Sequence, residues 1–506
     1  MTTSATNVAT FLLHNKKADQ PALLTPSGRH SYGELQSAIS RMATHLLSLG
    51  CKKGDRVILL GENSFFWVVA YLGILSAGLV CVPIAAGISE EDLQTVLAIT
   101  AALVVATPAN LVAKISARLC GMHLITDRPL PPVDGCLSQS VLSNLRPEKR
   151  DDAVSKVEPD DLAALMFTSG STGKPHGVMV SHRNIIANTE SIIRYLRLTE
   201  TDRVMTVLPF HYCFGASLLH THLRVGGSLV LDSRFLYPEK VLQSMLDLRC
   251  TGFAGVPSHF QILLRKSSLR KKAFPHLRYV QQAGGQLAPA FIQELRQALP
   301  NVEIFIMYGQ TEATARLSYL QPELLERKLG SVGKAIPGVK LRVVDEAGHS
   351  VRPGEIGEVT AEGENVSLGY WQQPEETASR FRNGVLYTGD LATVDEDGFI
   401  FIVDRAQDFL KCGGKRIGCR QIENQLQKFE CLVEAAVVPM ADDSLGEAVK
   451  AFVVSRMPDC PFLATCVYEF CRRNLAPQLV PRAVTSVPSL PKNNSGKVLK
   501  ALLRQL

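Results

Sequence analysis

The feature that most constrains the fold is a repeated alternation of apolar strand-like segments with helix-like segments. In the first round, across residues 30–110, a helix-like stretch closed by Gly50 is followed by the strand-like GDRVILLG. A second round runs from SHRNIIANTESIIRYLRL to VEIFIMYG. Strands that are apolar on both faces and alternate with helices favour a parallel sheet covered by helices. We therefore predict an α/β fold.

One apolar stretch is long enough to raise the question of a membrane span. Residues 65–88, FFWVVAYLGILSAGLVCVPIAAGI, carry no charge and are long enough on paper to span a bilayer. Gly78 and Pro83, however, divide the stretch into a helix and a short Val-rich strand. We therefore expect a buried helix–strand unit and no membrane span. The N-terminus lacks a basic region followed by a long apolar run, so no signal peptide is predicted.

The pattern changes twice towards the C-terminus. From about Gly333, short strands with closely spaced turn signals predict a β-rich subdomain over about 333–404. After Asp404, two helix-like and two strand-like segments predict a small α+β unit. We therefore predict a multi-subdomain N-terminal domain over residues 1–404 and a mobile C-terminal lid domain over 405–506. The candidate hinge lies between Val403 and Asp408.

Charge is unevenly divided between these two parts. Residues 405–506 hold 15 Lys+Arg and 9 Asp+Glu, a net charge of +6 that equals the net charge of the whole chain. A basic tail on a neutral body suggests an anionic ligand where the two meet, and a solvated basic surface is an equally good interpretation. The twelve Cys are scattered with no CxxC pair, which is typical of a reducing, cytoplasmic setting without disulfides or zinc.

The segment FTSGSTGKPHG, residues 167–177, is the strongest chemical signal. Its glycines and hydroxyls pack poorly, but its backbone N–H groups can surround a polyanion such as triphosphate. It is not the P-loop of nucleotide hydrolases, because Lys174 is followed by Pro175. It matches the SxxK motif of penicillin-binding enzymes, but the companion motifs SDN and KTG are absent from the chain.

Four further stretches accompany this segment in order. They are YGQTEAT (308–314), YTGDLATVDEDGFIFIVDR (387–405), QDFLKCGGKRIGCRQIE (407–423) and LPKNNSGKVLK (490–500). Together the five resemble the adenylate-forming superfamily of acyl-CoA synthetases, peptide-synthetase adenylation domains and luciferases, from about Tyr32 to Val498. The resemblance implies that ATP and Mg²⁺ activate a small-molecule carboxylic acid as acyl-AMP with release of pyrophosphate, and that a thiol then takes the acyl group. Positioning and screening of negative charge are expected to supply most of the catalysis.

The resemblance also implies roles for individual residues at the nucleotide. The implied nucleotide-binding residues are Thr168, Ser169, Gly170, Ser171, Thr172, Gly173, Lys174 and His176 at the phosphates, Gly284, Gly285 and Gln286 beside adenine, Tyr308, Gly309, Gln310 and Thr311 at the base and α-phosphate, and Asp390 and Arg405 at the ribose. Thr168 and Glu312 are the implied Mg²⁺ ligands, since a hard cation prefers oxygen. His176 stands where the family usually has Lys, so we expect nucleotide capture to weaken as the pH rises through the imidazole range.

The tail motifs imply the second half of the chemistry. Lys497 resembles the catalytic lysine that reaches the α-phosphate and acyl oxygens. Lys411, Gly413 and Gly414 resemble the turn that lines the path of the thiol. Gln407 stands at the hinge, where the family commonly has Asp or Lys.

The acyl pocket is expected to involve His211 and Tyr212, together with Gly285. His211 is a candidate catalytic residue, although a hydrogen-bonded core histidine is the competing interpretation. Residues 213–217 supply no carboxylate for an α-ammonium group, and burying such a group unpaired is costly. A plain carboxylic acid is therefore favoured over an α-amino acid.

We interpret the chain as a free-standing acid–thiol ligase. The expected acceptor is coenzyme A, and the closest alternative is phosphopantetheine on a separate acyl or peptidyl carrier protein, loaded with an acid or an amino acid such as proline. Glu312, Asp390 and Lys497 argue against a non-catalytic nucleotide sensor, while a luciferase-type oxygenase shares all these motifs. We expect no nucleic-acid partner.

Overall fold

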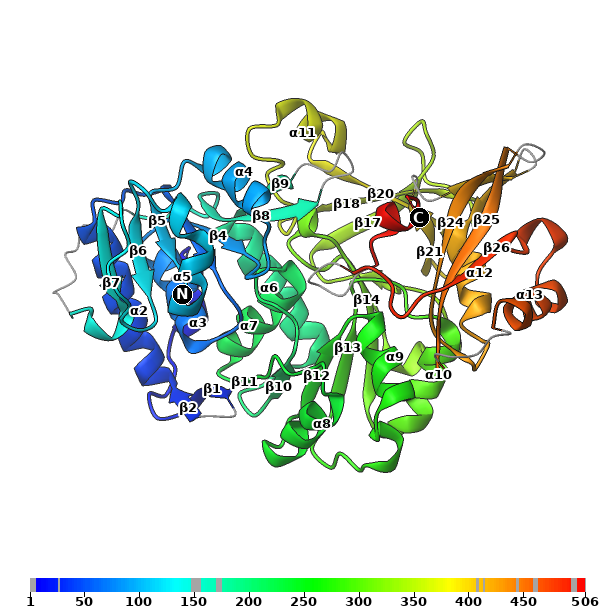
Figure 1. Cartoon of the computed structure of the whole chain (residues 1–506), viewed down its shortest axis with the longest axis horizontal. Coiled ribbons are helices and arrows are strands. Elements are labelled where there is room, and N and C mark those ends of the chain that lie inside the picture. Colours follow the sequence, from blue (N-terminus) through cyan, green and yellow to red (C-terminus); the bar gives the residue numbers. More distant parts are fainter. Residues whose placement is uncertain are drawn as a thin grey trace.

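The computed structural model describes residues 6–505, except 26–27, 147–155, 170–174, 406–408, 413–414, 443–445, 458–462 and 493–497. Figure 1 shows the N-terminal elements on one side, the C-terminal strands on the other, and the strands from β12 (Gly252–Gly255) to β14 (Glu303–Tyr308) between them. The fold is α/β, as predicted, with a large N-terminal body and a smaller C-terminal part.

The first large sheet is mainly parallel, and most of its strands come from the middle of the sequence. Among the described residues its strands lie in the order β16 (Lys334–Ala335), β15 (Ser318–Leu320), β14 (Glu303–Tyr308), β13 (Tyr279–Gln282), β12 (Gly252–Gly255), β10 (Arg203–Thr206), β11 (Ser228–Leu231), β1 (Pro21–Thr25) and β2 (Gly28–Ser31). The strands from β14 to β1 are parallel, and those beyond them at each edge are antiparallel.

The second large sheet belongs to the first third of the chain. Its described order is β7 (Ser138–Val141), β6 (His123–Thr126), β5 (Val104–Ala106), β3 (Arg56–Leu60), β4 (Val80–Ile84), β8 (Leu162–Ser169) and β9 (Pro175–Ser181). All its pairs are parallel except the β8–β9 hairpin.

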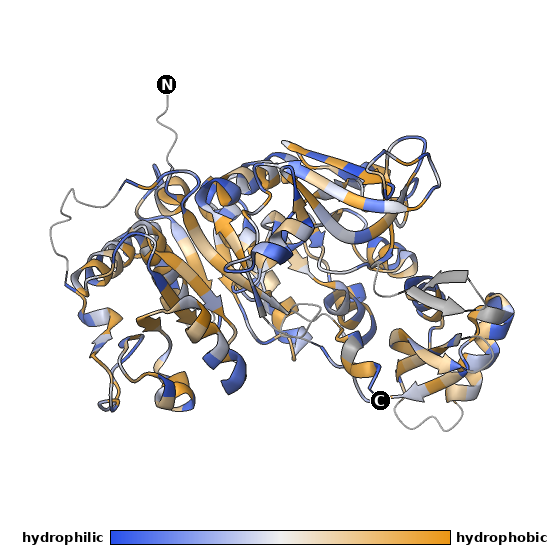
Figure 2. Cartoon of the chain, turned by 90° about the horizontal axis from the view of Figure 1, so that it is seen from above, coloured by the Kyte–Doolittle hydropathy of each residue, from blue (hydrophilic) through white to orange (hydrophobic). Residues whose placement is uncertain are grey.

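Helices cover both faces of these sheets. In the N-terminal body they are α1 (Val8–Leu13), α2 (Tyr32–Ser48), α3 (Phe65–Ser76), α4 (Glu90–Thr100), α5 (Ala109–Ile115), α6 (His182–Leu196), α7 (Cys213–Val225), α8 (Pro238–Asp247), α9 (Pro257–Lys266) and α10 (Pro289–Ala298). One apolar cluster joins both sheets through α1, α2, α3, α6 and α7, and a second packs α8 to α10 on the other face of the first sheet. Figure 2 shows apolar colouring along the strands and mixed colouring on the outer helices.

The uncharged stretch forms the predicted helix–strand unit. Ser64 caps α3, Gly78 turns the chain with a φ of +73°, and β4 follows with every residue buried. Such a turn requires a left-handed backbone, which glycine adopts without steric cost. No helix in the described part of the chain is long and apolar enough to cross a membrane.

Two smaller sheets complete the described structure. One contains β17 (Val339–Val344), β18 (Gly357–Gly363), β19 (Phe381–Arg382), β20 (Val385–Val394) and β21 (Ile400–Arg405), with α11 (Pro374–Arg380) beside it. The other contains β22 (Phe409–Cys412), β23 (Lys415–Gly418), β24 (Leu432–Asp442), β25 (Gly446–Ser455) and β26 (Ala483–Ser486), with α12 (Cys419–Leu426), α13 (Leu463–Asn474) and α14 (Lys500–Leu503). β16 pairs with the nine-stranded sheet, so the separate β-rich unit begins at Val339, and β21 carries it to Arg405.

Candidate active site

The glycine-rich segment lies at the tip of the β8–β9 hairpin. Thr168 pairs with His176 and Phe167 with Gly177, so the two ends of the segment are held side by side. Residues 170–174 (Gly170, Ser171, Thr172, Gly173 and Lys174) lie outside the described residues, and of Ser169 only the backbone is described. The hairpin is anchored on a distant segment, since the Met179 N–H donates to the Gly369 carbonyl (2.9 Å) and the Trp371 N–H to the Gly177 carbonyl (2.8 Å).

His176 is packed against Tyr370 of that distant segment. The two rings meet edge to face with centroids 5.4 Å apart. Both ring nitrogens of His176 are buried, and neither has a hydrogen-bond partner among the described residues. The polar atoms of this ring are therefore available to a group that the described structure does not contain.

Tyr370 connects the hairpin to the YGQTE motif. Its hydroxyl donates to Glu312 Oε1 at 2.9 Å. Burial, followed by the neighbouring Glu312 carboxylate, raises the pKa of Tyr370, so the hydroxyl stays protonated and serves as a donor. Glu312 lies in the short helix η4 (Thr311–Ala313), and its backbone carbonyl accepts from the Ser367 N–H at 2.9 Å. The carboxylate is thus oriented from outside its own motif.

Tyr308 and Asp390 form a second connection between distant motifs. The Tyr308 hydroxyl donates to Asp390 Oδ2 at 2.7 Å, and Asp390 is 4% exposed. Asp390 on β20 pairs with Arg405 on β21, whose side chain is not described. Gly309 is required by a close approach, because a Cβ there would stand 2.0 Å from the Ala315 carbonyl oxygen. Gln310 Nε2 is buried without a partner in the described structure.

The expected acyl-pocket residues lie beside the nucleotide motif. Tyr212 directly precedes α7, and Cys213, the first residue of that helix, places its Sγ 3.5 Å from Thr311 Oγ1. Burial lowers the pKa of His211 to about 4, so its imidazole is neutral at physiological pH. His211 Nε2 is buried and, within the described residues, has no partner. The interpretation of His211 as a fully hydrogen-bonded core histidine is therefore not supported at this atom.

Three of the predicted segments end at one edge of the first sheet. Gly284 and Gly285 follow β13, Tyr308 ends β14, and His211 follows β10 by a short connection. Gly284 has a φ of +81°, the Gly285 carbonyl accepts from Gln282 Nε2 at 2.7 Å, and Gln286 is partly buried just beyond. The carboxyl edge of a parallel sheet is the usual place for a ligand in α/β folds.

The C-terminal candidates are only partly described. Lys411 lies on β22 opposite Arg416, and its side chain is not described. Gln407, Gly413, Gly414 and Lys497 lie outside the described residues. The described C-terminal part does contact the body, since α9 packs near β24 and the Lys492 ammonium contributes to the lowered pKa of His259, after burial as the main cause.

The donor set fits magnesium better than a metal held by protein alone. No group of three or more His, Cys, Asp or Glu side chains within the described structure is arranged to hold a metal ion. Mg²⁺ characteristically keeps several waters and uses one or two carboxylates together with substrate phosphates. One oriented carboxylate, Glu312, beside the predicted phosphate-binding segment is the arrangement that such a cation needs.

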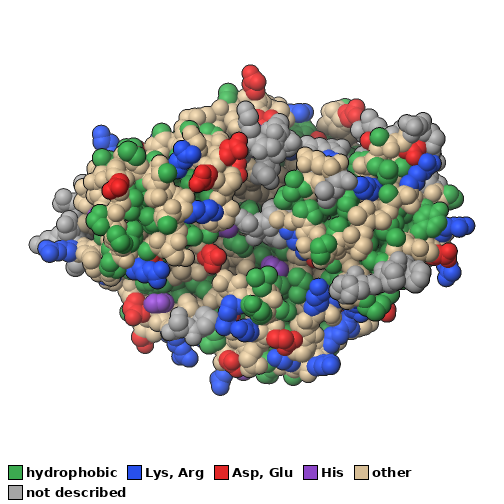
Figure 3. Space-filling view, viewed as in Figure 1, with side chains coloured by type: hydrophobic (Ala, Val, Ile, Leu, Met, Phe, Trp, Pro, Cys, Tyr) green, Lys and Arg blue, Asp and Glu red, His purple; other side chains and the backbone are tan. Residues whose placement is uncertain are grey.

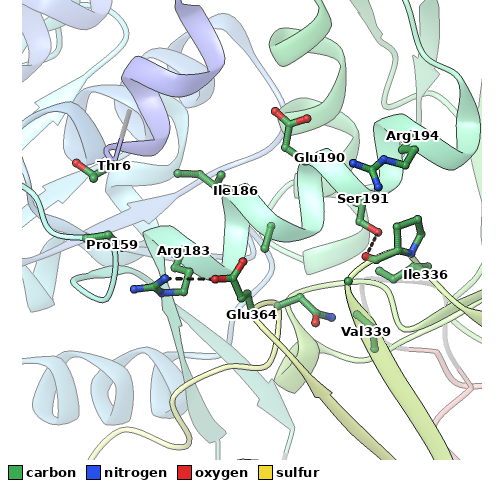
Figure 4. A pocket seen from close by; sticks show the side chains of 14 residues that line it. Thr6, Pro159, Arg183, Ile186, Glu190, Ser191, Arg194, Ile336, Val339 and Glu364 are labelled. Atoms are coloured by element: carbon green, nitrogen blue, oxygen red, sulfur yellow. Dashed lines mark hydrogen bonds and ion pairs between the residues drawn. The ribbon is translucent and has the colours of Figure 1, made fainter. Parts of the chain in front are cut away.

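One hollow on the described surface lies away from these residues. It measures about 380 Å³ and lies along α6 near the start of β17, where Arg183 pairs with Glu364 and the Ser191 hydroxyl donates to the Pro337 carbonyl (Figure 4). None of the predicted site residues lines it. The face in Figure 3 is also hollowed near its middle, where histidine side chains are visible.

Comparison with known proteins identifies the family. Residues 13–371 match the model of the AMP-binding enzyme family, and residues 421–497 match that of the AMP-binding enzyme C-terminal domain. The chain is 30% identical to a long-chain-fatty-acid–CoA ligase of Escherichia coli O157:H7, over 96% of this chain and 92% of the relative. It is 32% identical to a feruloyl-CoA synthase of Amycolatopsis sp, over 94% of this chain and 93% of the relative.

Solved structures of adenylate-forming enzymes have the same fold as this chain. ATP-bound MatB of Rhodopseudomonas palustris superposes with a TM-score of 0.87 at 29% identity, covering 99% of each chain. The anthranilate CoA ligase AuaEII, in complex with anthranoyl-AMP, superposes with a TM-score of 0.89 at 26% identity, covering 99% of this chain and 96% of that one.

The chain therefore belongs to the AMP-binding enzyme family. Its class is that of the AMP-forming acid–thiol ligases, which use ATP and Mg²⁺ to activate a carboxylic acid as acyl-AMP and then pass the acyl group to a thiol.

Sequence reasoning missed three residues that the structure brings to this site. Tyr370 orients Glu312, Cys213 contacts Thr311, and Arg316 is buried against Phe214. Of the three, only Arg316 is marked in the sequence: it is the single charged residue in the run ATARLSYL that follows Glu312.

Proposed function

We propose that this enzyme ligates a small carboxylic acid to coenzyme A through an acyl-AMP intermediate. The observation that carries the proposal is the connected chain of contacts from the β8–β9 hairpin through Tyr370 to Glu312, and from Tyr308 to Asp390. Each link joins motifs that are far apart in the sequence. Coenzyme A is supported as the acceptor because the relatives named above are CoA ligases.

In the first half-reaction we assign the nucleotide to the edge between the hairpin and β14. Residues Thr168 to Lys174 and His176 hold the β- and γ-phosphates, Tyr308 to Thr311 and Gly284 to Gln286 surround the base and α-phosphate, and Asp390 and Arg405 hold the ribose. When Mg²⁺ is bound by Thr168 and Glu312, it screens the phosphate charge. The acid's carboxylate then attacks the α-phosphorus, and pyrophosphate leaves.

His211 is assigned to the acid. A neutral imidazole can hydrogen-bond a carboxylate oxygen without forming the tight ion pair that would make the nucleophile less reactive. Its Nε2, which is buried and has no partner among the described residues, supports this role.

The C-terminal part is assigned to charge neutralisation and thiol entry. Lys497 offsets the negative charge that grows on the α-phosphate during attack. Lys411, Gly413 and Gly414 line the entry of the thiol, and Gln407 serves as the hinge between the predicted domains 1–404 and 405–506. We place the enzyme in the cytoplasm, in keeping with ten free cysteines among the described residues.

The test is a screen of short, medium, long and aromatic acids, and proline, with ATP and Mg²⁺. Acid-dependent AMP and pyrophosphate, followed by acyl-CoA when coenzyme A is added, are expected. Formation of ADP and phosphate without AMP contradicts adenylation. Product on a phosphopantetheinylated carrier protein but not on coenzyme A contradicts the proposed acceptor and favours carrier loading. Light output with oxygen reveals a luciferase-type reaction.

A further inference from the structure

Arg316 is a buried cation immediately beyond the YGQTEAT motif. It is 1% exposed, and its guanidinium carbon lies 4.1 Å above the Phe214 ring. Nε approaches Met307 Sδ at 3.3 Å, and Nη1 approaches the Ala315 carbonyl at 3.5 Å. Nη2 is buried and has no hydrogen-bond partner among the described residues. The guanidinium thus retains an unused donor inside the protein.

No carboxylate of the described structure lies within ion-pair distance of Arg316. Arg265, whose side chain is 6% exposed, shows the contrast: it also stacks on an aromatic ring, Phe291, but it is paired with Glu294. The titratable side chains that interact with Arg316 are Tyr195, which also hydrogen-bonds to it, and Cys213. Both are neutral, because burial raises the pKa of the Cys213 thiol and raises the pKa of Tyr195 to about 12. A buried charge without a counter-charge is costly, so an anion that binds there recovers that cost.

Arg316 lies beside the elements expected to bound the acyl pocket. Phe214, on which it stacks, follows His211, Tyr212 and Cys213 directly, and Cys213 contacts Thr311 of the nucleotide motif. Gln281 lies on the face of the first sheet that carries Phe305 and Met307, because it pairs in register with Phe305, and it is 1% exposed. Neither amide atom of Gln281 has a partner in the described structure. Buried polar groups without a partner among the described residues therefore lie on this face of the first sheet.

We propose that Arg316 binds a second carboxylate, so that the enzyme activates dicarboxylic acids. The inference rests on the proposed function and specifies its substrate class. The reacting carboxylate cannot be the partner of Arg316, because it must reach the α-phosphorus and loses its charge in the acyl-adenylate. A second carboxylate keeps its charge through both half-reactions. An α-ammonium group, by contrast, is repelled by the buried guanidinium.

The experiment compares matched acids that differ only by a methyl in place of one carboxylate: succinate with butyrate, adipate with hexanoate, and phthalate with 2-methylbenzoate. The kcat/KM of acid-dependent pyrophosphate release is measured for the wild type, Arg316→Met, Arg316→Lys and Arg265→Met. Binding of each acid is measured in parallel by calorimetry with a non-cleavable ATP analogue.

The wild type is expected to prefer the diacid of at least one pair by tenfold or more. Arg316→Met should lower kcat/KM and affinity for that diacid about 100-fold while sparing or improving its monoacid partner, because an uncompensated carboxylate is then buried. Arg316→Lys should retain part of the preference. Arg265→Met should keep the preference unchanged, even if its stability falls.

Two outcomes overturn the inference while leaving the proposed function intact. One is a wild type that activates monoacids at least as well as every matched diacid. The other is an Arg316→Met variant that loses activity equally on both members of a pair, as a merely structural residue would. If no acid yields AMP, the proposed function fails, and the binding arm alone then decides whether Arg316 recognises a dicarboxylate.

Discussion

At the scale of single residues, the candidate site depends on side chains that orient other side chains. Glu312 accepts from the Tyr370 hydroxyl, and Asp390 accepts from the Tyr308 hydroxyl. A hydrogen bond to an ionised carboxylate is stronger than a neutral one and fixes the direction of its remaining lone pairs. The two carboxylates that we assign to Mg²⁺ and ribose are therefore both positioned by tyrosines.

The substitution Tyr370→Phe tests this positioning at Glu312. It removes the donor while keeping the ring that packs against His176. Because a hydrogen bond to a charged group contributes about 1.5–3 kcal/mol, the Mg²⁺ concentration for half-maximal pyrophosphate release should rise roughly tenfold or more. The measurement is a Mg²⁺ titration at saturating ATP, with Tyr237→Phe as the control, because Tyr237 is exposed and directly precedes α8. A titration curve identical to that of the wild type would show that Tyr370 does not position Glu312.

At the scale of elements, the β8–β9 hairpin determines where the glycine-rich segment begins and ends. Its last residue, Ser181, is also the cap of α6, where the Ser181 hydroxyl accepts from the Asn184 N–H at 3.2 Å. The hairpin is thus held by a helix at its base and by residues 369–371 along its edge. The segment at its tip is the one that we assign to the phosphates.

The variant His176→Lys tests the charge that this hairpin presents. The wild-type imidazole pairs with phosphate as a cation only when protonated, whereas an ammonium stays charged well above neutral pH. We expect ATP to bind about tenfold more tightly to the variant at pH 8, and the decline in ATP affinity with rising pH to flatten. Equilibrium ATP binding between pH 6 and 8.5 measures both effects. An unchanged pH profile would indicate that the segment relies on Lys174 instead.

At the scale of the whole molecule, the two half-reactions are expected to use different parts of the C-terminal domain. Lys497→Ala should reduce acid-dependent acyl-AMP formation by about 10²–10³-fold, because a charge-assisted contact to the transition state is lost. With pre-made acyl-AMP and coenzyme A, the same variant should form thioester at near the wild-type rate. Gly414→Leu should do the reverse, since a bulky side chain obstructs the thiol.

The decisive measurement is both half-reactions on both variants. Lys500→Ala is the matched control, because Lys500 pairs with Glu423 at 2.9 Å within the C-terminal part and has no assigned catalytic role. Equal loss of both steps in Lys497→Ala, with the fold intact, would mean that one fixed arrangement serves the whole reaction.

The buried histidines make a prediction about the stability of the whole chain. Burial lowers the pKa of His182, His211, His222 and His259 to about 4 and that of His220 to about 3. Between pH 4 and 6.5 the unfolded chain therefore binds more protons than the folded one. The stabilisation is complete above about pH 6.5 and is lost as the pH falls towards 4.

These five side chains should accordingly take up about four protons in total when the chain unfolds near pH 5. Each proton adds about 1.4 kcal/mol per pH unit to the slope of the free energy of unfolding against pH. Calorimetry in buffers of different ionisation enthalpy counts the protons directly. His259→Gln should remove about one of them. Uptake of fewer than two protons by the wild type at pH 5 would contradict the burial of these imidazoles as neutral groups.

The sequence predicted correctly what depends on local pattern. Alternating apolar strands and helices predicted the α/β fold, Gly78 divided the apolar stretch into α3 and β4, and five ordered motifs predicted the AMP-forming ligase class. The roles of individual residues, from Thr168 to Lys497, remain predictions. Their spacing along the chain indicates which chemistry is present but not how each side chain is oriented.

By itself, then, the sequence determined the class of fold and the class of reaction, because strand and helix periodicity and motif order are properties of neighbouring residues. Only the tertiary structure decided that Tyr370 contacts both Glu312 and His176, and that Arg316 is buried with no carboxylate of the described residues paired to it. Tyr370 and Glu312 are 58 residues apart in the chain, and their contact exists only because β9 pairs with residues 369–371. Burial likewise depends on residues from other elements. In the sequence Arg316 looks like an ordinary surface residue, and only the fold packs Phe214, Met307 and Tyr195 against it.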